Sequence, residues 1–585
     1  MRNHVAAAAL LLLCGCGASE MPAAAMPDAG PEWPAVPAIA PDAAVRGAYQ
    51  TLEQEYDFGR MSVADEQTGA SYETDIHGYI RYPQDAPGPY PVLLFQHGRH
   101  QTCETGIGQL PVPVGDDNCP DLAPVITPAD SYRGYDYLVD NLASHGYAVL
   151  SIDTNDINDH DGSASSGDAG ALARAELILR HLDEFRQIDQ AGGNGFDALR
   201  GRLDFSRVGL MGHSRGGEGV DKAVAVNAGR AQPHAIRAVF ALAPTDYNGQ
   251  VIAAADPGGV AFATLLPYCD GDVENLMGAY VYDASRLAGT GPRLQILAMG
   301  ANHNYFNTVW TSDDWTIHGT AADAHCGTQA STQQRDTPEG QRALGQFFIA
   351  SFFRAFIGGE TAFAAYWTGR SGVPASACPD GVAPCDARYH LSVQPAPDAR
   401  LLIDATLDDT ALQTNMLGLP VRFEGFGDFG WCAPSGADGG GCAVAAPTFS
   451  TAPQLYLNWQ APARYTTELG GLDASAYDTL SLRVGVSHGD AANAGGQDFE
   501  IVLTDTAGHA VRVGAAAHSR ALFDPPGDAF DAGGSEKTTL NAVRVPLGAF
   551  TGIDLSRLQS LELAFGATPA GTVQLTDLMF QRLLP

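Results

Sequence analysis

Lysine is almost absent from this chain, and basic residues as a group are scarce. The only lysines are Lys222 and Lys537, and 33 Lys and Arg stand against 67 Asp and Glu, which gives a formal net charge of −34 at pH 7. A surface this acidic repels nucleic acid and anionic lipid, because both carry negative charge. We therefore expect no nucleic-acid partner.

Long apolar runs are also scarce, and none is long enough to span a membrane. Val5 to Leu13 follows a short basic start and predicts an export signal. It ends in Leu13-Cys14-Gly15-Cys16, which resembles the lipobox of bacterial lipoproteins and makes Cys16 the lipidated residue. We expect an exported cell-envelope lipoprotein, at the outer membrane or surface, whose only membrane contact is this lipid. Secretion after ordinary signal cleavage is the alternative.

No C-x-x-C pair occurs, so the cysteines do not indicate a metal site, and no cofactor is expected. Eight cysteines remain after Cys14 and Cys16, and an even number in an exported protein favours disulfides. Proximity in the sequence favours three pairs and leaves a fourth by remainder, although many other connectivities are open. The pairs are Cys103–Cys119, Cys378–Cys385, Cys432–Cys442 and Cys269–Cys326.

Composition divides the chain into four parts. Residues 1–16 form the signal, and residues 17–45 are rich in Ala and Pro, which predicts a flexible linker. In residues 46–395 apolar strands alternate with helical patterns, which predicts an α/β domain with a mainly parallel sheet covered on both faces. In residues 396–585 short strands separated by Gly, Asp and Pro turns predict an all-β sandwich, most simply a jelly roll.

The motif Gly212-His213-Ser214-Arg215-Gly216 carries the strongest chemical signal. It follows the apolar run Val208 to Met211 and precedes a helical pattern, which is the strand, turn and helix of a nucleophile elbow. Small residues two positions on either side of the serine allow strand and helix to approach closely. The pattern predicts Ser214 as a nucleophile.

A serine nucleophile needs a base and an orienting acid, which in this arrangement follow it in the order acid, then histidine. His303 lies directly after the apolar run Ile296 to Met299, where the base is expected. Asp270 and Asp272 both follow the preceding apolar run, and we favour Asp270 because it is nearer the end of the strand. Asp246, one strand earlier, is a weaker third candidate.

The oxyanion hole of such a site is made of two backbone N–H groups. One is expected from Arg215, the residue after the nucleophile. The other is expected from Arg99 in the loop Gln96-His97-Gly98-Arg99-His100, where Gly98 permits a tight turn. His97 and His100 are interpreted as residues that shape this loop.

These motifs resemble those of secreted α/β-hydrolases of the dienelactone hydrolase and polyester hydrolase (cutinase-like) group. The resemblance covers about residues 75–360 and includes the Ser214, Asp270 and His303 positions in order. It implies the α/β-hydrolase fold and hydrolysis of carboxylic esters through an acyl-enzyme, without a metal. One departure is the long segment from Asn302 to Gln341, whose aromatic residues predict either a substrate wall or simple packing. These are Tyr305, Phe306, Trp310 and Trp315.

The expected function is therefore that of an exported serine esterase, with polyester or lipid-like esters as candidate substrates. Three alternatives stay open: a polysaccharide deacetylase of the acetylxylan esterase type, a serine peptidase, and a non-catalytic glycan-binding surface protein.

The C-terminal part resembles the jelly-roll modules of secreted carbohydrate-active enzymes. Trp431, Tyr456 and Trp459 are candidates for stacking on a glycan or an insoluble polymer, but strand alternation places Trp459 on the core face with its leucine neighbours. Asp404 and Asp577 are candidates for a structural Ca²⁺ site, since hard carboxylates suit that ion.

Overall fold

The fold is given by a computed structural model. The structure describes residues 38 and 40–582, with gaps at 106–125, 163–166, 248–258, 318, 434–451, 488–489, 524–525, 528–536 and 538. The predicted signal, its Cys16 and most of the predicted linker lie outside the described residues. By their contacts, residues 33–585 form a single compact unit.

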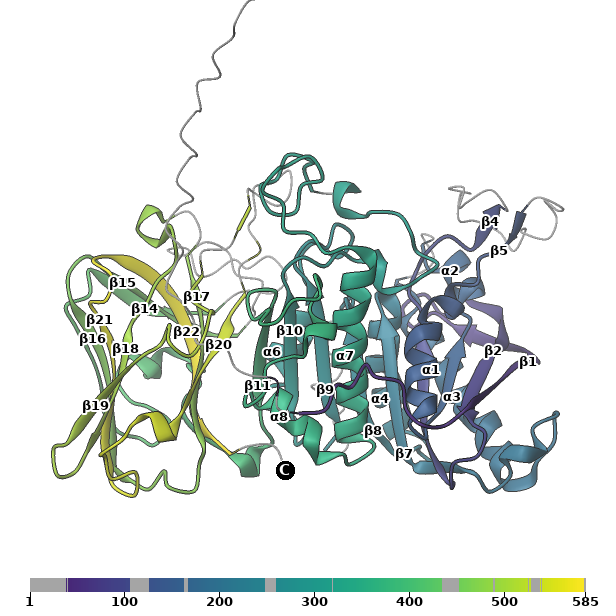
Figure 1. The fold of residues 1–585 in the computed structure, drawn as a ribbon, viewed down its shortest axis with the longest axis horizontal. Helices are drawn as coiled ribbons and strands as arrows, with labels where there is room; N and C mark the ends of the chain where they lie inside the picture. The colour runs from purple at the N-terminus through teal and green to yellow at the C-terminus, as the bar shows by residue number, and fades with distance from the viewer. Residues whose placement is uncertain are drawn as a thin grey trace, which may run out of the picture. The chain divides into compact units, whose positions relative to one another are not determined.

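The first part of the chain, residues 51–394, forms a nine-stranded mixed sheet with its covering helices (Figure 1). Its central pairings, from β6 through β3, β7, β8 and β9 to β10, are parallel, whereas the edge pairings with β1, β2 and β11 are antiparallel. In spatial order the strands are β1 (Thr51–Ala64), β2 (Ser71–Pro83), β6 (Ala148–Ile152), β3 (Tyr90–Gln96), β7 (Leu203–His213), β8 (Ile236–Leu242), β9 (Ala261–Pro267), β10 (Arg293–Ala298) and β11 (Tyr389–Gln394).

Helices cover both faces of this sheet (Figure 1). On one face α1 (Asp136–Ser144) and α7 (Pro338–Phe356) share an apolar cluster with inward side chains of the strands. On the other face α3 (Ala171–Ala191), α4 (Arg215–Ala228) and α6 (Gly278–Ser285) contribute to a second cluster. Strands such as β3, β6 and β9 are buried throughout, as expected for parallel strands with both faces covered. The described residues also contain two short helices, α2 (Asn155–His160) and α8 (Ala364–Trp367).

The end of the predicted linker is packed rather than free. Ala43 is fully buried, and the Asn141 amide donates hydrogen bonds to the carbonyls of Ala44 and Val45. The Tyr366 hydroxyl bonds the carbonyl of Ala40 in the same way. Composition missed this contact because Ala and Pro signal weak intrinsic structure, whereas partners far along the chain hold these residues.

The C-terminal part contains two antiparallel sheets. They share one apolar cluster, so they pack face to face as a sandwich. One sheet contains β14 (Asp428–Cys432), β15 (Gln454–Trp459), β22 (Gly571–Gln581), β17 (Thr479–Val486) and β20 (Asn541–Pro546), with β12 (Arg400–Asp404) on β22. The other contains β13 (Val421–Glu424), β16 (Ala463–Leu472), β21 (Leu558–Phe565), β18 (Glu500–Asp505) and β19 (Ala510–Gly514). A small two-stranded sheet, β4 (Cys103–Thr105) with β5 (Ile126–Pro128), belongs to the first half of the chain.

The candidate ligand-binding residues of the sandwich have other partners. Trp459 is fully buried in the core, where it contacts Phe565, so it cannot stack on a glycan. The Asp577 carboxylate accepts hydrogen bonds from Arg286 and Arg483, and two guanidinium groups already balance its charge. The calcium prediction is therefore not favoured at Asp577. None of the helices in the described ranges is long and apolar enough to cross a membrane.

Candidate active site

Ser214 occupies a sharp turn between a buried strand and a helix. It follows the last residue of β7 and caps the N-terminus of α4, with φ of 58° and ψ of −127°. A positive φ is unfavourable for a residue with a side chain and is tolerated where the surrounding structure imposes it. Here the Ser214 amide donates to the carbonyl of Leu242, and the Ser214 carbonyl accepts from Gly217.

Glycine is required on both sides of this turn. A Cβ atom on Gly212 would lie 1.9 Å from the Gly216 carbonyl oxygen, and a Cβ atom on Gly216 would lie 2.7 Å from that of Gln96. The loop after β3 is equally close, since a Cβ atom on Gly98 would lie 2.4 Å from that of Ser214. The structure thus places the Gly98–Arg99 loop directly against the candidate nucleophile.

Asp161 links the two residues predicted as oxyanion donors, and no sequence motif indicates it. Its buried carboxylate accepts from Arg99 Nε at 2.9 Å and lies 3.1 Å from Arg215 Nη1, and it also pairs with Arg174. The side chains of Arg99 and Arg215 are therefore anchored to one carboxylate. This anchor restrains the backbone of both residues near Ser214.

His303 and Asp270 are hydrogen bonded to each other. His303 Nδ1 donates to Asp270 Oδ2 at 2.8 Å, and both side chains are almost completely buried. The other oxygen of Asp270 accepts from the backbone amides of Asp272 and Val273, at 2.9 and 2.6 Å. His303 Nε2 is buried and has no hydrogen-bond partner among the described residues.

Asp272 is placed differently from Asp270. Its side chain is 50 % exposed, and its Oδ2 lies 3.9 Å from Nε2 of His303, on the opposite ring nitrogen from Asp270. Asp246, the third candidate acid, is half-buried, and its amide lies against the sulfur of Met277.

His213, which precedes the nucleophile, connects the elbow to the histidine loop. The Tyr135 hydroxyl donates to His213 Nδ1 at 2.9 Å, and His213 Nε2 donates to the carbonyl of His303 at 3.0 Å. Burial, together with the positive charge of nearby His303, holds the pKa of His213 well below its ordinary value, so the ring is neutral and this donor–acceptor pattern is consistent. The rings of His213 and His303 are 5.0 Å apart. Neither Tyr135 nor His213 is marked as a functional residue by its sequence pattern.

Asp314 joins the acid loop to the histidine loop. Its Oδ2 accepts from the amides of Gly271 and His303, at 2.8 and 3.1 Å, and its Oδ1 accepts from Asn304 at 3.1 Å. Burial, followed by the charge of Asp270, raises the pKa of Asp314 to about 6, so it is ionised at neutral pH. No local motif marks this residue in the sequence.

The aromatic residues of the 302–341 segment pack inward. Phe306, Trp310 and Trp315 are 0–2 % exposed, and only Tyr305 is partly accessible. The Trp310 ring stacks on His100 at 4.8 Å and contacts His213 at 4.7 Å. These three residues therefore fit the prediction of simple packing rather than that of a substrate wall.

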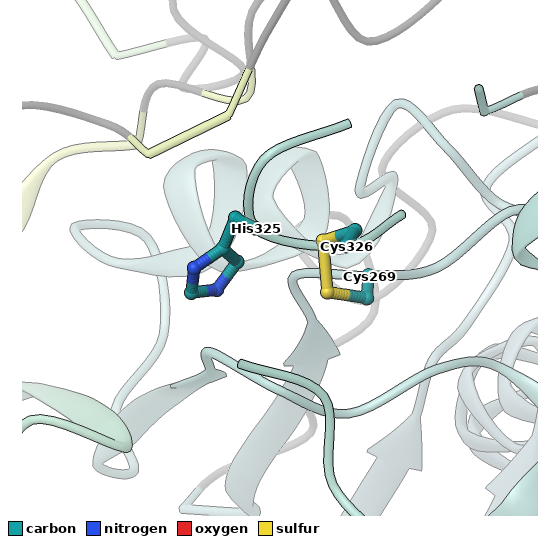
Figure 2. A group of neighbouring side chains, drawn as sticks. All are labelled: Cys269, His325 and Cys326. Atoms are coloured by element: carbon teal, nitrogen blue, oxygen red, sulfur yellow. A yellow bond between two sulfur atoms is a disulfide. The ribbon is translucent and has the colours of Figure 1, made fainter. Parts of the chain in front are cut away.

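Cys269, directly before Asp270, forms a disulfide with Cys326 (Figure 2). With His325 these cysteines are grouped closely enough to hold a metal ion, but both sulfurs are already in the disulfide. His325 instead bonds the carbonyl of Met299 at 2.7 Å. The disulfide thus ties the acid loop to the segment after His303.

The other disulfide predictions have two outcomes. The pair Cys378–Cys385 is present. Cys103 and Cys432 are also disulfide-bonded, while their predicted partners, Cys119 and Cys442, lie outside the described residues. Disulfides persist in oxidising compartments and favour an extracellular location.

The charges around His303 favour its protonated form. Burial by itself lowers the pKa of His303, but the charge of Asp270 and its hydrogen bond, followed by the charges of Asp272 and Asp314, raise it to about 9. Burial raises the pKa of Asp270, and the positive His303 and Lys537 outweigh burial and lower it. At neutral pH the site therefore holds an ion pair.

Comparison with known proteins connects part of the chain to a family. No curated protein matches this chain. A family model described as PETase, PET hydrolase-like, matches residues 123–264, which include β6, β7, Ser214 and α4 but end before Asp270 and His303. Over this part the chain is similar to PET hydrolase-like proteins, a similarity that implies the α/β-hydrolase fold and favours hydrolysis of esters.

Proposed function

We propose that this protein is an exported serine esterase that hydrolyses carboxylic esters, with polyesters as the favoured substrate class. The observation that carries the proposal is the hydrogen-bonded pair of His303 and Asp270 beside an elbow that holds Ser214 at positive φ. The PET hydrolase-like match over residues 123–264 supports both the reaction and the polymer. In this proposal residues 46–395 form the hydrolase domain and residues 396–585 a jelly-roll accessory domain, and the chain is anchored by a lipid on Cys16.

In the proposed mechanism Ser214 Oγ attacks the ester carbonyl while His303 Nε2 takes its proton. Nε2 suits this step because it is the buried ring nitrogen without a partner among the described residues. Asp270 holds the Nδ1 proton, which keeps Nε2 free to accept. As the tetrahedral intermediate collapses, the bond to the alcohol oxygen breaks and His303 returns the proton to the leaving alcohol. A water then attacks the acyl-enzyme by the same route, which releases the acid and restores Ser214.

Two backbone N–H groups, from Arg99 and Arg215, would stabilise the negative oxygen of the intermediate. Arg215 occupies the first turn of α4, whose N-terminal amides favour negative charge. The ion pairs to Asp161 restrain both arginines before substrate binds, and preorganised donors of this kind contribute about 3–4 kcal/mol each in serine hydrolases.

Labelling by a fluorophosphonate probe tests the reaction class. We expect Ser214 to be the labelled residue, located by peptide mass spectrometry. Protonated His303 cannot accept the serine proton, so the labelling rate should rise about tenfold per pH unit below its pKa of about 9 and level off above it. A protein that stays unlabelled across this range, or is labelled elsewhere, contradicts the proposal.

Tyr247 offers a test of the polymer substrate. Its ring is 53 % exposed, lies 5.5 Å from the Arg215 guanidinium, and follows Thr245, whose amide bonds the Ser214 carbonyl. An exposed ring beside the side chain of Arg215, the residue after the nucleophile, suits the repeat units of an apolar polymer. We expect Tyr247→Ala to lower hydrolysis of a polyester film roughly fivefold, the effect of about 1 kcal/mol of lost contact, and to leave a short p-nitrophenyl ester unaffected. Equal losses on both substrates would count against a polymer contact at Tyr247.

A further inference from the structure

The C-terminal part of the chain places a buried lysine against the acid loop of the hydrolase domain. Lys537 is 3 % exposed, and its Nζ donates to the backbone carbonyl of Asp270 at 2.6 Å. Its ammonium group also lies 5.4 Å from the centre of the Trp315 ring. One of the two lysines of the whole chain therefore lies beside the residue that orients His303.

Other described residues of the C-terminal part also lie against the acid loop and its surroundings. The hydroxyl of Tyr268, the residue directly after β9, donates to the carbonyl of Pro526 at 2.9 Å. Phe523 packs against the apolar cluster that contains Cys269 and Trp315, and it stacks on His390 of β11. The approach of Lys537 is thus one part of a broader contact with the acid loop.

Lys537 is surrounded by carboxylates. Burial lowers its pKa to about 8, and the charges of Asp270, Asp314, Glu274 and Asp323 oppose that fall. A buried ammonium is costly unless negative charge balances it, and two of these carboxylates, Asp270 and Asp314, also bond the His303 loop. Asp270 and Asp314 thus interact with both Lys537 and protonated His303.

We propose that Lys537 is a positioning residue of the esterase site, whose ammonium group holds the Asp270 loop and balances the two buried carboxylates beside His303. The sandwich then contributes to the catalytic unit in addition to being an accessory domain. This inference rests on the proposed function.

The expected consequence is a lower affinity of His303 for its proton while Lys537 is charged. The groups that face His303 are Asp270, Asp272 and Asp314, which favour the imidazolium, and His213 and His100, which burial keeps neutral. Lys537 is a cation that opposes the charge of Asp270 and Asp314. Because the two cations share the carboxylates, they titrate as a coupled pair between about pH 8 and 9.

The test compares Lys537→Met and Lys537→Arg with Lys222→Met as the matched control. Lys222 is the other lysine; it lies on α4 and pairs with Glu66. The measured quantity is the rate of fluorophosphonate labelling of Ser214 in the mature full-length protein, from pH 6 to 10. Below pH 7.5, where wild-type Lys537 is charged, we expect Lys537→Met to be labelled about tenfold more slowly, the effect of one pKa unit on His303. Above pH 9.5 the two rates should converge, because wild-type Lys537 is then neutral.

The other variants sharpen the outcome. Lys537→Arg keeps its charge, so it should match the wild type below pH 7.5 and reach its plateau at lower pH, and Lys222→Met should follow the wild type throughout. A Lys537→Met labelling rate that is lowered equally at every pH, or not at all, overturns the inference. A variant that fails to fold is recognised by its melting curve. In that case the pH at which Lys537→Arg reaches its plateau tests the inference, and a plateau at the wild-type pH overturns it. If wild-type Ser214 is itself not labelled, the proposed function fails instead.

Discussion

Replacing Ser214 by alanine is expected to lower kcat for a short p-nitrophenyl ester by about 10⁵- to 10⁶-fold, the loss typical of a removed serine nucleophile. The hydroxyl is the only group deleted. Alanine keeps the Cβ atom, so the strained φ of 58° and the hydrogen bonds of the turn are unchanged. Folding should therefore be preserved while the covalent step is lost. A small residual rate is expected from the oxyanion donors.

Ser206 provides the matched control for this experiment. It lies on the same strand, β7, but is exposed, and its hydroxyl bonds Asp204 near the surface. Ser206→Ala should retain activity within about twofold, as expected for a surface substitution. If Ser214→Ala keeps a tenth or more of the wild-type rate, the chain does not act through this serine.

Asp270→Asn is expected to lower kcat by about 10⁴-fold, whereas Asp272→Asn should change it less than about tenfold. Asparagine fills the same space but presents an amide that does not fix the Nδ1 proton of His303, so the ring loses the tautomer that accepts from serine. The Asp270 oxygen that accepts from Asp272 and Val273 can be retained as the amide oxygen. The loop should consequently stay folded, and circular dichroism and the melting temperature would verify this.

Asp272→Asn acts only through charge. Asp272 lies 3.9 Å from Nε2, is half exposed, and helps to raise the pKa of His303. Removing its charge should lower that pKa and move the acid limb of the kcat/KM profile to lower pH, with little loss at the plateau. If the plateau of kcat/KM fell more for Asp272→Asn than for Asp270→Asn, Asp272 rather than Asp270 would be the orienting acid.

The nucleophile elbow was predictable from local sequence because all the residues that form it lie within ten positions of one another. The buried strand, the flanking glycines and the helix start are neighbours in the chain, and their close contacts follow from those residue types. The loops of Asp270 and His303 were predictable for a related reason. The carboxyl ends of adjacent parallel strands meet at one edge of a sheet, and β9 and β10 are such a pair.

The preference for Asp270 over Asp272 gains support from the structure. The two residues share one turn and one side-chain type, so sequence order could only favour one of them. In the fold, the disulfide of Cys269 and the amides of Asp272 and Val273 orient the Asp270 carboxylate toward Nδ1, while Asp272 is left at the surface.

The sequence by itself determined the motifs on which the proposed chemistry rests: a serine at a predicted strand–helix turn, with an acid loop and a histidine loop after it in order. Only the tertiary structure decided what surrounds that chemistry. Asp161, Asp314 and Lys537 belong to no motif, because each acts on residues 10 to 267 positions away in the chain. Their contacts exist only once the sheet, the long 302–341 segment and the sandwich are packed together, since buried charges are placed by the partners that folding brings to them.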